Sequence, residues 1–439
     1  MSAREAFVEE LAAGGVQHSR APELLARASR DFGGHAQGNT WLVAAPRSTA
    51  ELRLLVGLAR QHGVRLTARG SGGSQAGQSI PNDGVSVDFS GWSGVSAIAA
   101  EGSLDVDAGA TFRSVVEACR GTGWLPPVMP LHLDLTVGGV LSAGGFGSTS
   151  HRNGLVASQV RSFEAVLGQG ELVRAGPSER RDVFDAVLAG QGKAGLIATA
   201  RLALEQVPPT LRTLTIVHDD FGGLLDELLA WSGLPEVLHQ EAFCCSTFHG
   251  LTRQEGRRVP LTSWSYSAQL TTAADVTWQP ETRGRVLGEC IDDTYDFAGR
   301  YDLRFEAMRA TGAWQAFHPW FEVLLPAATA RELVPQAVRM LPPFFGDAHR
   351  ILVFADTDRP SSFQFPSDGP VVGFAVLPLG IPGAYHPAAL AVLERLDRLC
   401  REGGGMRYRS GHQFGERGGT TRSSPFDPDG IFSSSSSSR

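Results

Sequence analysis

The chain has 439 residues, of which 42% are hydrophobic and 19% are charged, and its formal net charge at pH 7 is −7. This length exceeds what one compact core usually supports, so we expect two domains of ordinary globular composition. The acidic balance argues against nucleic-acid and anionic-membrane partners, and no apolar stretch is long enough to cross a bilayer. The five cysteines form no CxxC pair, so no metal site is predicted. The charged N-terminus lacks a signal-peptide core, and we expect a cytoplasmic protein.

Short strands and helices alternate in the N-terminal half. Residues 41–45 are apolar, and Ser48 and Glu51 then form a capping-box pattern at the start of a helix that Gly63 ends. Two prolines interrupt the alternation at 208–209, and we place a domain boundary there. Further strands are expected at 64–68, 85–89, 104–108, 160–167, 171–174 and 195–207, with a helix at 111–120.

Longer and more mixed segments follow, and they predict a sheet covered by helices. The last part of the chain, 403–439, is loop-like and ends in a run of serines. Together with the N-terminal half, this gives an α+β protein with segments at 1–207, 208–402 and 403–439. In the middle segment, strands are expected at 214–218, 264–271, 351–355 and 371–377, and helices at 221–231, 287–297 and 387–401.

A glycine-rich segment follows the predicted strand at 64–68. Residues 67–78 read TARGSGGSQAGQ, in which glycine allows backbone amides to turn toward one point and bind anionic oxygens. Arg69 adds positive charge, and Ser71 and Ser74 add short hydroxyl donors. The spacing matches neither GxGxxG nor GxxxxGK[ST], so neither a Rossmann nor a Walker site is predicted. Taken alone, the segment fits a flexible surface loop as well as it fits a phosphate cradle.

A second glycine-rich segment lies at 135–147 and reads LTVGGVLSAGGFG. It mixes glycine with residues of the kind that are usually buried. This mixture predicts backbone packed closely against a large flat ligand rather than a solvated linker. Two such segments, each flanked by strands, point to one dinucleotide held between them.

The pairing of ARGSGGS at 68–74 with LTVGG at 135–139 is similar to the FAD-pyrophosphate loops of the vanillyl-alcohol-oxidase superfamily, whose FAD-binding domain is called PCMH-type. Other landmarks resemble those of cytokinin dehydrogenases, and they run in family order over nearly the whole chain. They are DFGG at 31–34, RNG at 152–154, GKAGLI at 192–197, HPWFEV at 318–323, and FDP at 426–428 with Ile431.

The resemblance implies an α+β fold with a two-subdomain PCMH-type FAD-binding domain at 1–207. An α/β cap over the substrate would occupy 208–402, and the segment 403–439 would return to the FAD domain. The serine run would then lie beside the flavin instead of fraying. The expected FAD contacts are Ala68, Arg69, Gly70, Ser71, Gly72, Gly73, Ser74, Gln78, Thr136, Gly138, Gly139, Ser142, Phe146, Leu196, Ile197, Tyr408, Ser433 and Ser436.

The sequence departs from the family pattern at the residues that bind the flavin covalently and at the catalytic base. The flavin-linking histidine falls on Gly73 and a second attachment cysteine on His132, so FAD is expected to bind without a covalent bond. The catalytic aspartate falls on Leu131, which cannot accept a proton. His132 and Asp134 are the nearby candidates. As a strand, this stretch would place them on one face and Leu131 on the other, unless a bulge intervenes. Alternatively, His132 is a strand-edge residue and Asp134 a turn former.

The HPWFEV landmark supplies further candidates on the substrate side. Glu322 stands at an asparagine-like position and would either pair with a cationic substrate or be a solvated strand residue. The resemblance also assigns His318 and Trp320 to the substrate side, although a histidine at the position of His318 more often packs against Trp320 than reacts.

The reaction implied by the resemblance is hydride transfer from a substrate C–H bond to the flavin. We expect an FAD-dependent oxidase or dehydrogenase acting on a small-molecule amine, alcohol or acid in specialised metabolism. The electron acceptor would be oxygen or another molecule. One alternative is cytokinin dehydrogenase activity proper, with His132 or Glu322 as the base. The other is a flavin-fold binding protein without turnover.

Overall fold

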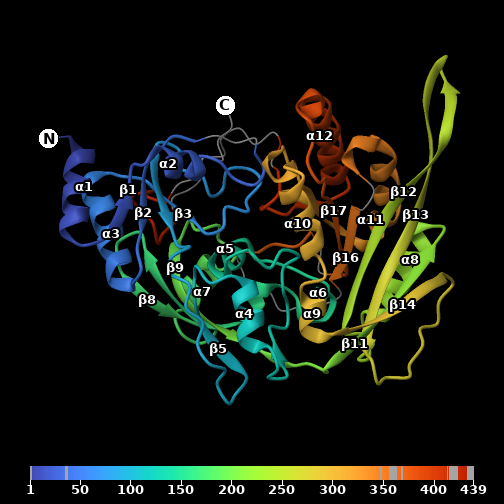
Figure 1. Ribbon diagram of the computed structural model, residues 1–439, viewed down its shortest axis with the longest axis horizontal. Coiled ribbons are helices and arrows are strands. Elements are labelled where there is room, and N and C mark those ends of the chain that lie inside the picture. The colour runs from blue at the N-terminus through green and yellow to red at the C-terminus, as the bar shows by residue number, and fades with distance from the viewer. Residues whose placement is uncertain are drawn as a thin grey trace.

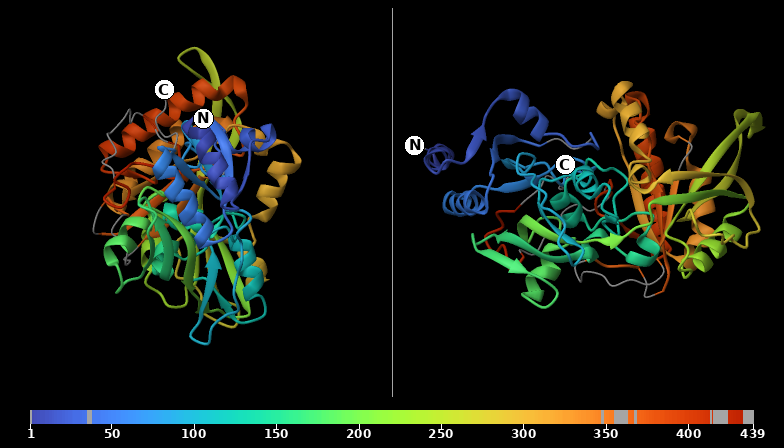
Figure 2. Two further views of the ribbon diagram at one scale, coloured as in Figure 1. Left: turned by 90° about the vertical axis from the view of Figure 1, so that its left-hand side faces the viewer. Right: turned by 60° about the horizontal axis from the view of Figure 1, so that its bottom comes forward.

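The computed structural model describes residues 2–34, 38–346, 349–354, 363–366, 369–412, 414 and 424–432. They form an α+β protein whose two halves lie side by side (Figures 1 and 2). One half carries two four-stranded sheets, and the other carries an eight-stranded sheet. In the described part of the chain, no helix combines the length and apolarity that a membrane crossing requires.

The first sheet has the strand order β1-β2-β4-β3, and its last three strands are parallel. Helix α3 shows how the sequence sets its own ends. Ser48 Oγ accepts a hydrogen bond from the Glu51 amide, and Gly63 ends the helix in the left-handed region. The Glu51 carboxylate accepts from the Arg47 amide instead of the Ser48 amide, so only half of the capping box forms. The elements are α1 (Ala3–Ala13), β1 (Gln17–Ser19), α2 (Pro22–Ala28), β2 (Thr40–Ala45), α3 (Thr49–His62), β3 (Leu66–Arg69) and β4 (Gly84–Asp88).

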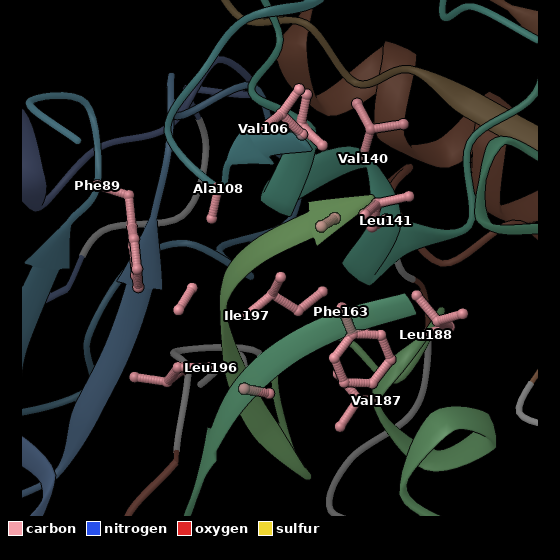
Figure 3. Packing of buried hydrophobic residues seen from close by; sticks show 14 of the residues in the cluster. Phe89, Val106, Ala108, Val140, Leu141, Phe163, Val187, Leu188, Leu196 and Ile197 are labelled. Atoms are coloured by element: carbon pink, nitrogen blue, oxygen red, sulfur yellow. The ribbon is translucent and has the colours of Figure 1, made fainter. Parts of the chain in front are cut away.

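The second sheet is antiparallel, with the order β5-β9-β7-β8, and it shares one hydrophobic core with the first sheet. Figure 3 shows Leu141, Phe163 and Ile197 packed in this core. The strand expected at 195–207 ends earlier, and a two-residue strand follows it. The elements are β5 (Ser103–Asp107), α4 (Phe112–Cys119), β6 (Trp124–Leu125), α5 (Val137–Ala143), α6 (Ser150–Asn153), β7 (Val160–Leu167), β8 (Leu172–Ala175), α7 (Arg181–Val187), β9 (Gly195–Ala203) and β10 (Glu205–Gln206).

The eight-stranded sheet has the order β14-β11-β13-β12-β16-β17-β15-β18. Helices α8, α11 and α12 pack on one of its faces through a second hydrophobic core. Strands β12 and β13 form a long hairpin that projects from the molecule (Figure 1). The elements are β11 (Thr210–His218), α8 (Phe221–Trp231), β12 (His239–Gln254), β13 (Arg257–Ala273), β14 (Arg285–Asp293), α9 (Thr294–Ala298), α10 (Asp302–Ala310), β15 (Phe321–Pro326), α11 (Ala327–Met340), β16 (His349–Phe354), β17 (Val371–Val376), α12 (His386–Glu402) and β18 (Met406–Arg407).

The helix expected at 287–297 is wrong. The chain forms the edge strand β14 there and turns into the short helix α9 only at Thr294. Leu287 and Ile291 have helical spacing, but both are exposed on the edge strand, with 54% and 62% of their surface accessible. The pairing of β14 with β11, which continues across one register shift between Thr215 and Ile216, therefore outweighs the local apolar pattern.

The C-terminal segment returns to the first half of the molecule. The Leu66 amide donates to the Ile431 carbonyl at 2.7 Å, and the Gly168 amide donates to the Phe426 carbonyl at 2.8 Å. Asp427 accepts hydrogen bonds from the amides of Ile431 and Phe432 and thereby closes this turn. These contacts agree with the expected return, while the exact domain boundaries stay predictions. Ala355 and the serine positions Ser433 and Ser436 lie outside the described residues.

Candidate active site

One cavity brings together both glycine-rich segments and the eight-stranded sheet. Its empty volume, including the part open to solvent, is about 1840 Å³. Every predicted FAD contact within the described residues lines this cavity. The cavity therefore joins the segments expected to hold the cofactor to the sheet that was expected to cover the substrate.

The first glycine-rich segment turns a run of backbone amides toward the cavity. In the described part of the chain, the N–H groups from Gly70 to Ser74 have no acceptor, and all five residues line the cavity. The carbonyls point the other way, since Gly72 accepts from the Phe32 amide at 2.9 Å and Ser74 accepts from the Gly33 amide at 3.0 Å. The segment is thus a nest for anionic oxygens rather than a free surface loop.

The DFGG landmark at 31–34 holds this nest from behind. Asp31 accepts hydrogen bonds from Ser74 Oγ at 2.9 Å and from the Gly77 amide at 2.7 Å. The Ser74 hydroxyl, expected to contact the cofactor, is therefore used within the protein. Gln78 likewise binds the Arg409 carbonyl with its side chain and ties the loop to the C-terminal segment.

Arg69 places a positive charge at the nest. Its side chain lines the cavity and is 7% exposed, and burial lowers its pKa. Gly72 adopts a positive φ of 75°, and a Cβ atom there would lie 2.7 Å from the Arg69 guanidinium carbon. Glycine at this position is therefore required both by the backbone and by the packing of Arg69. Unpaired amides beside a buried cation fit a pyrophosphate.

The second glycine-rich segment is not the loop that we expected, because it forms the short helix α5 with Thr136 at its N-cap. Gly138 allows this helix to approach β5, since a Cβ atom there would lie 2.8 Å from Ala108 Cβ. The Ser142 hydroxyl donates to the Gly138 carbonyl at 2.7 Å, one turn earlier in α5, so this hydroxyl is used within the helix. The predicted close packing of the backbone is present at Gly138, but the segment is a short helix and not a loop.

Phe146 and Tyr408 close the cavity beside α5. Their rings meet edge to face with centroids 4.5 Å apart, and the Tyr408 hydroxyl accepts a hydrogen bond from the Gly145 amide at 2.9 Å. Burial raises the pKa of Tyr408, so its phenol stays neutral. Leu196 and Ile197, at the start of β9, complete the apolar wall.

Comparisons with known proteins also indicate an FAD-binding protein. Residues 41–176 match the FAD binding domain family. The chain is 27% identical over 400 residues to an uncharacterised oxidoreductase, ORF5 in the fasciation locus of Rhodococcoides fascians, covering 88% of this chain and 87% of that protein. It is 28% identical over 340 residues to cytokinin dehydrogenase 8 of Oryza sativa subsp. indica, covering 68% of this chain and 64% of that protein.

Among solved structures, the fold is similar to that of the xylooligosaccharide oxidase from Myceliophthora thermophila C1 in complex with xylobiose. The TM-score is 0.72 at 15% sequence identity, and the match covers 92% of this chain and 90% of the other. The chain carries an FAD-binding domain and is an FAD-dependent oxidoreductase.

Gly73 and His132, the positions at which the sequence resemblance would place covalent flavin attachment, both line the cavity of the oxidoreductase. Gly73 offers no nucleophile, and a Cβ atom there would overlap the Leu135 Cδ2 methyl. His132 stacks on Phe305 with ring centroids 4.0 Å apart. Its side chain is 8% exposed, and burial lowers the pKa of His132 to about 4, so the imidazole is neutral at neutral pH.

The stretch 131–134 is not a strand in the oxidoreductase. It forms a turn in which the Leu135 amide donates to the His132 carbonyl at 3.2 Å, so strict alternation of faces does not apply. Leu131 and His132 both line the cavity, whereas Leu133 is buried in the core. The position of the family aspartate therefore faces the cavity but carries leucine.

Asp134 points away from the cavity. It accepts hydrogen bonds from Arg113 Nε at 2.6 Å and from Arg309 Nη2 at 2.8 Å. Arg113 also binds Asp302 through both terminal nitrogens, at 2.7 and 3.0 Å. This ion-pair cluster joins α4 to α10. The structure gives Asp134 a role in holding the halves together and does not support the expected catalytic one.

The expectation that His318 faces the substrate is also wrong. His318 is fully buried, does not line the cavity, and stacks on Phe32 with centroids 4.2 Å apart. Its Nδ1 lies 3.0 Å from the Phe32 carbonyl oxygen. Its ring partner is thus Phe32 rather than Trp320. Trp320 lines the cavity, as expected, and donates from Nε1 to the Pro378 carbonyl at 3.0 Å.

Glu322 lies on β15 and faces the cavity, in contrast to a solvated strand residue. Its carboxylate accepts from Ser410 Oγ at 3.1 Å, and Ser410 also lines the cavity. Burial raises the pKa of Glu322 to about 7, although the Ser410 hydrogen bond and the Arg350 charge act in the opposite direction. A carboxyl group with this pKa exchanges protons readily near neutral pH.

Sequence reasoning missed three cationic residues that line the cavity: Lys193, Arg350 and Arg409. Arg350 lies within the buried strand β16, next to the apolar run from Ile351 to Phe354. A charged residue in such a run was the available signal, since arginine is rarely buried unless it is paired.

Proposed function

We propose that this oxidoreductase takes a hydride from a C–H bond of a small molecule in the cavity while Glu322 accepts a proton from the same molecule. The observation that carries this proposal is the place of Glu322. Among the described residues that line the cavity, it has the sole carboxylic acid side chain, and its pKa of about 7 suits a general base. His132, which is neutral and stacked on Phe305, is the weaker candidate.

The chain's own residues hold the cofactor and shape the reaction. The amides from Gly70 to Ser74 and the Arg69 guanidinium would bind the FAD pyrophosphate. FAD, when bound, supplies the acceptor for the hydride. Because Gly73 carries no nucleophile and His132 replaces the attachment cysteine, we propose non-covalent binding.

FAD, Glu322 and a final electron acceptor together account for the protons and electrons of the reaction. The substrate loses a hydride from carbon, and the proton of its hydroxyl or amine group passes to Glu322. The two electrons then leave to oxygen or to another acceptor, and the proton leaves Glu322 for solvent. Apolar residues, including Leu131 and Trp320, exclude water from the substrate end.

The likeness to cytokinin dehydrogenases supports a second candidate function, cytokinin cleavage itself. Leucine at position 131 argues against it, because Glu322 would then have to replace a base on a different element. Incubation with isopentenyladenine and a dye acceptor separates the two, since only cytokinin cleavage would release adenine.

The proposed function is tested by mixing FAD-loaded protein anaerobically with panels of amines, alcohols and acids. We expect compounds of at least one panel to bleach the visible flavin band of the wild type. The same compounds should bleach the band of Glu322→Gln much more slowly, although this variant still binds FAD. Protein that stays colourless after addition of FAD would overturn the proposal. Bound flavin that can be photoreduced but that no panel bleaches would instead support a binding protein without turnover.

A further inference from the structure

A buried cluster of charged residues borders the substrate end of the cavity. Glu241 on β12 is 3% exposed and binds two guanidinium groups. Its Oε2 accepts from Arg350 Nε at 2.8 Å, and its Oε1 accepts from Arg300 Nη2 at 2.9 Å. Arg304, one turn along the chain, donates to the Leu377 carbonyl, and its buried Nε has no hydrogen-bond partner among the described residues.

This cluster carries more positive than negative charge. Glu241 is one carboxylate against the guanidinium groups of Arg300, Arg304 and Arg350. The phenol of Tyr301, which lies under Arg300 and Arg350, stays neutral because burial raises its pKa. Buried charges without a partner are costly, so the excess favours an additional anion.

Arg350 is the member of the cluster that reaches the cavity. Arg350 lines it, whereas Arg300, Arg304 and Glu241 do not. Glu241 engages Nε and Nη2 of Arg350 at 2.8 and 2.7 Å, and the structure gives Nη1 no partner among the described residues. The guanidinium is therefore fixed in place by one carboxylate and retains donors for another.

The sheet aligns Arg350 with Glu322. Arg350 on β16 stands directly opposite Ala375 on β17, and Ala375 stands directly opposite Glu322 on β15. All three side chains thus share the face that lines the cavity, and the Cα atoms of Arg350 and Glu322 are separated by two strand spacings, about 10 Å. The small Ala375 leaves the space between them open. Leu324 and Leu352, which lie on the same face, are apolar.

We propose that the substrate is a carboxylic acid with an apolar body, whose carboxylate binds Arg350 and whose oxidisable hydroxyl or amine group lies toward Glu322. This inference rests on the proposed function, because it takes the cavity to be the substrate site. The chemical class is a hydroxy acid or amino acid. The carboxylate neutralises the excess charge of the cluster, and the apolar body contacts Leu324 and Leu352.

The inference is tested with FAD-loaded protein and two probes of the same shape, benzoate and benzamide, by calorimetric titration and by perturbation of the flavin spectrum. We expect the wild type to bind benzoate roughly tenfold or more tightly than benzamide, as a charge-assisted hydrogen bond would give. Arg350→Gln should lose this preference, and Arg350→Lys should retain part of it. Wild-type protein that does not distinguish the probes would overturn the inference.

Arg300→Gln is the matched control, because it removes a guanidinium from the same Glu241 carboxylate without changing the cavity lining. It should lower stability but keep the preference for benzoate. Equal loss of preference in both variants would contradict direct binding at Arg350. If Arg350→Gln does not fold, the preference for benzoate over benzamide in the wild type and in Arg350→Lys still tests the inference. Bleaching by neutral substrates without any preference for benzoate would refute this inference while leaving the proposed function intact.

Discussion

Gly70 and Thr136 are in contact across the two glycine-rich segments of the cofactor site. A Cβ atom on Gly70 would lie 2.9 Å from Thr136 Cβ and would overlap the Thr136 hydroxyl. The amide nest after β3 and the N-terminus of α5 are therefore held at a separation that only glycine at position 70 permits. The backbone of Gly70 is not in the left-handed region, so packing rather than conformation imposes this requirement.

Replacing Gly70 by alanine should reduce FAD binding while leaving the fold intact. The added methyl group would push the nest away from α5 and misalign its amides. The double variant Gly70→Ala/Thr136→Gly should recover part of the FAD, because it removes the side chain that the methyl group meets but also a residue that lines the cofactor site. FAD content after gel filtration measures both effects. Gly57→Ala is the control, since an added Cβ in that exposed helical position meets nothing within 4 Å. Equal FAD content in Gly70→Ala and wild type would contradict this account.

FAD should leave the protein on denaturation. No nucleophile is present at position 73, and His132 is stacked on Phe305 rather than free to react. Acid precipitation followed by centrifugation should leave the yellow colour in the supernatant. A denaturing gel should show no flavin fluorescence at the protein band. Fluorescence that remains with the protein would reveal a covalent bond at a residue outside the family positions.

The oxidation rate should rise with pH through about 7, because Glu322 must be ionised to accept a proton. Glu322→Gln should lower the rate of flavin bleaching by roughly 10²–10⁴-fold, the usual contribution of a general base, and should remove this pH step. FAD content serves as the control for folding. An unchanged pH step in Glu322→Gln would assign the titration to another group.

The same residue should make the protein less stable as pH rises. Burial raises the pKa of Glu322 from 4.5 to about 7, so the folded state binds more protons than the unfolded state between these values. Stability therefore falls across this window. Glu322→Gln should be more stable than wild type at pH 8 by roughly 1–3 kcal/mol, with little difference below pH 4. Urea unfolding at both pH values measures this, with Glu394→Gln on the exposed face of α12 as the control.

The cofactor half of the site was predictable because its contacts come from short contiguous segments. Glycine at positions 70 and 138 is visible in the sequence, and the close approach that it allows needs no knowledge of distant strands. The substrate half was not predictable in this way. Arg350, Ala375 and Glu322 meet only through strand register, which hydrophobic periodicity does not specify.

Errors in the sequence-based prediction have the same origin. Asp134 was a candidate because it is an ionisable group close in sequence to Leu131, but the chain turns at His132, and the carboxylate reaches Arg113 and Arg309. Leu287 has helical spacing to Ile291, yet long-range pairing with β11 makes this segment a strand. Sequence patterns reflect local conformational preferences, whereas contacts with residues distant in the sequence determine the structure of both segments.

Asp134→Asn should leave the rate of substrate-driven flavin bleaching unchanged and should lower stability slightly. The carboxylate binds Arg113 and Arg309, but its side chain is 30% exposed and the two arginine side chains are 39% and 43% exposed. Exposed pairs of this kind contribute about 0–1 kcal/mol each. Arg113→Gln should destabilise more, because it also releases Asp302. Thermal unfolding and single-turnover reduction of the flavin measure the two effects separately. A large loss of rate with wild-type FAD content and stability would return Asp134 to the reaction and require a conformation in which it leaves Arg113.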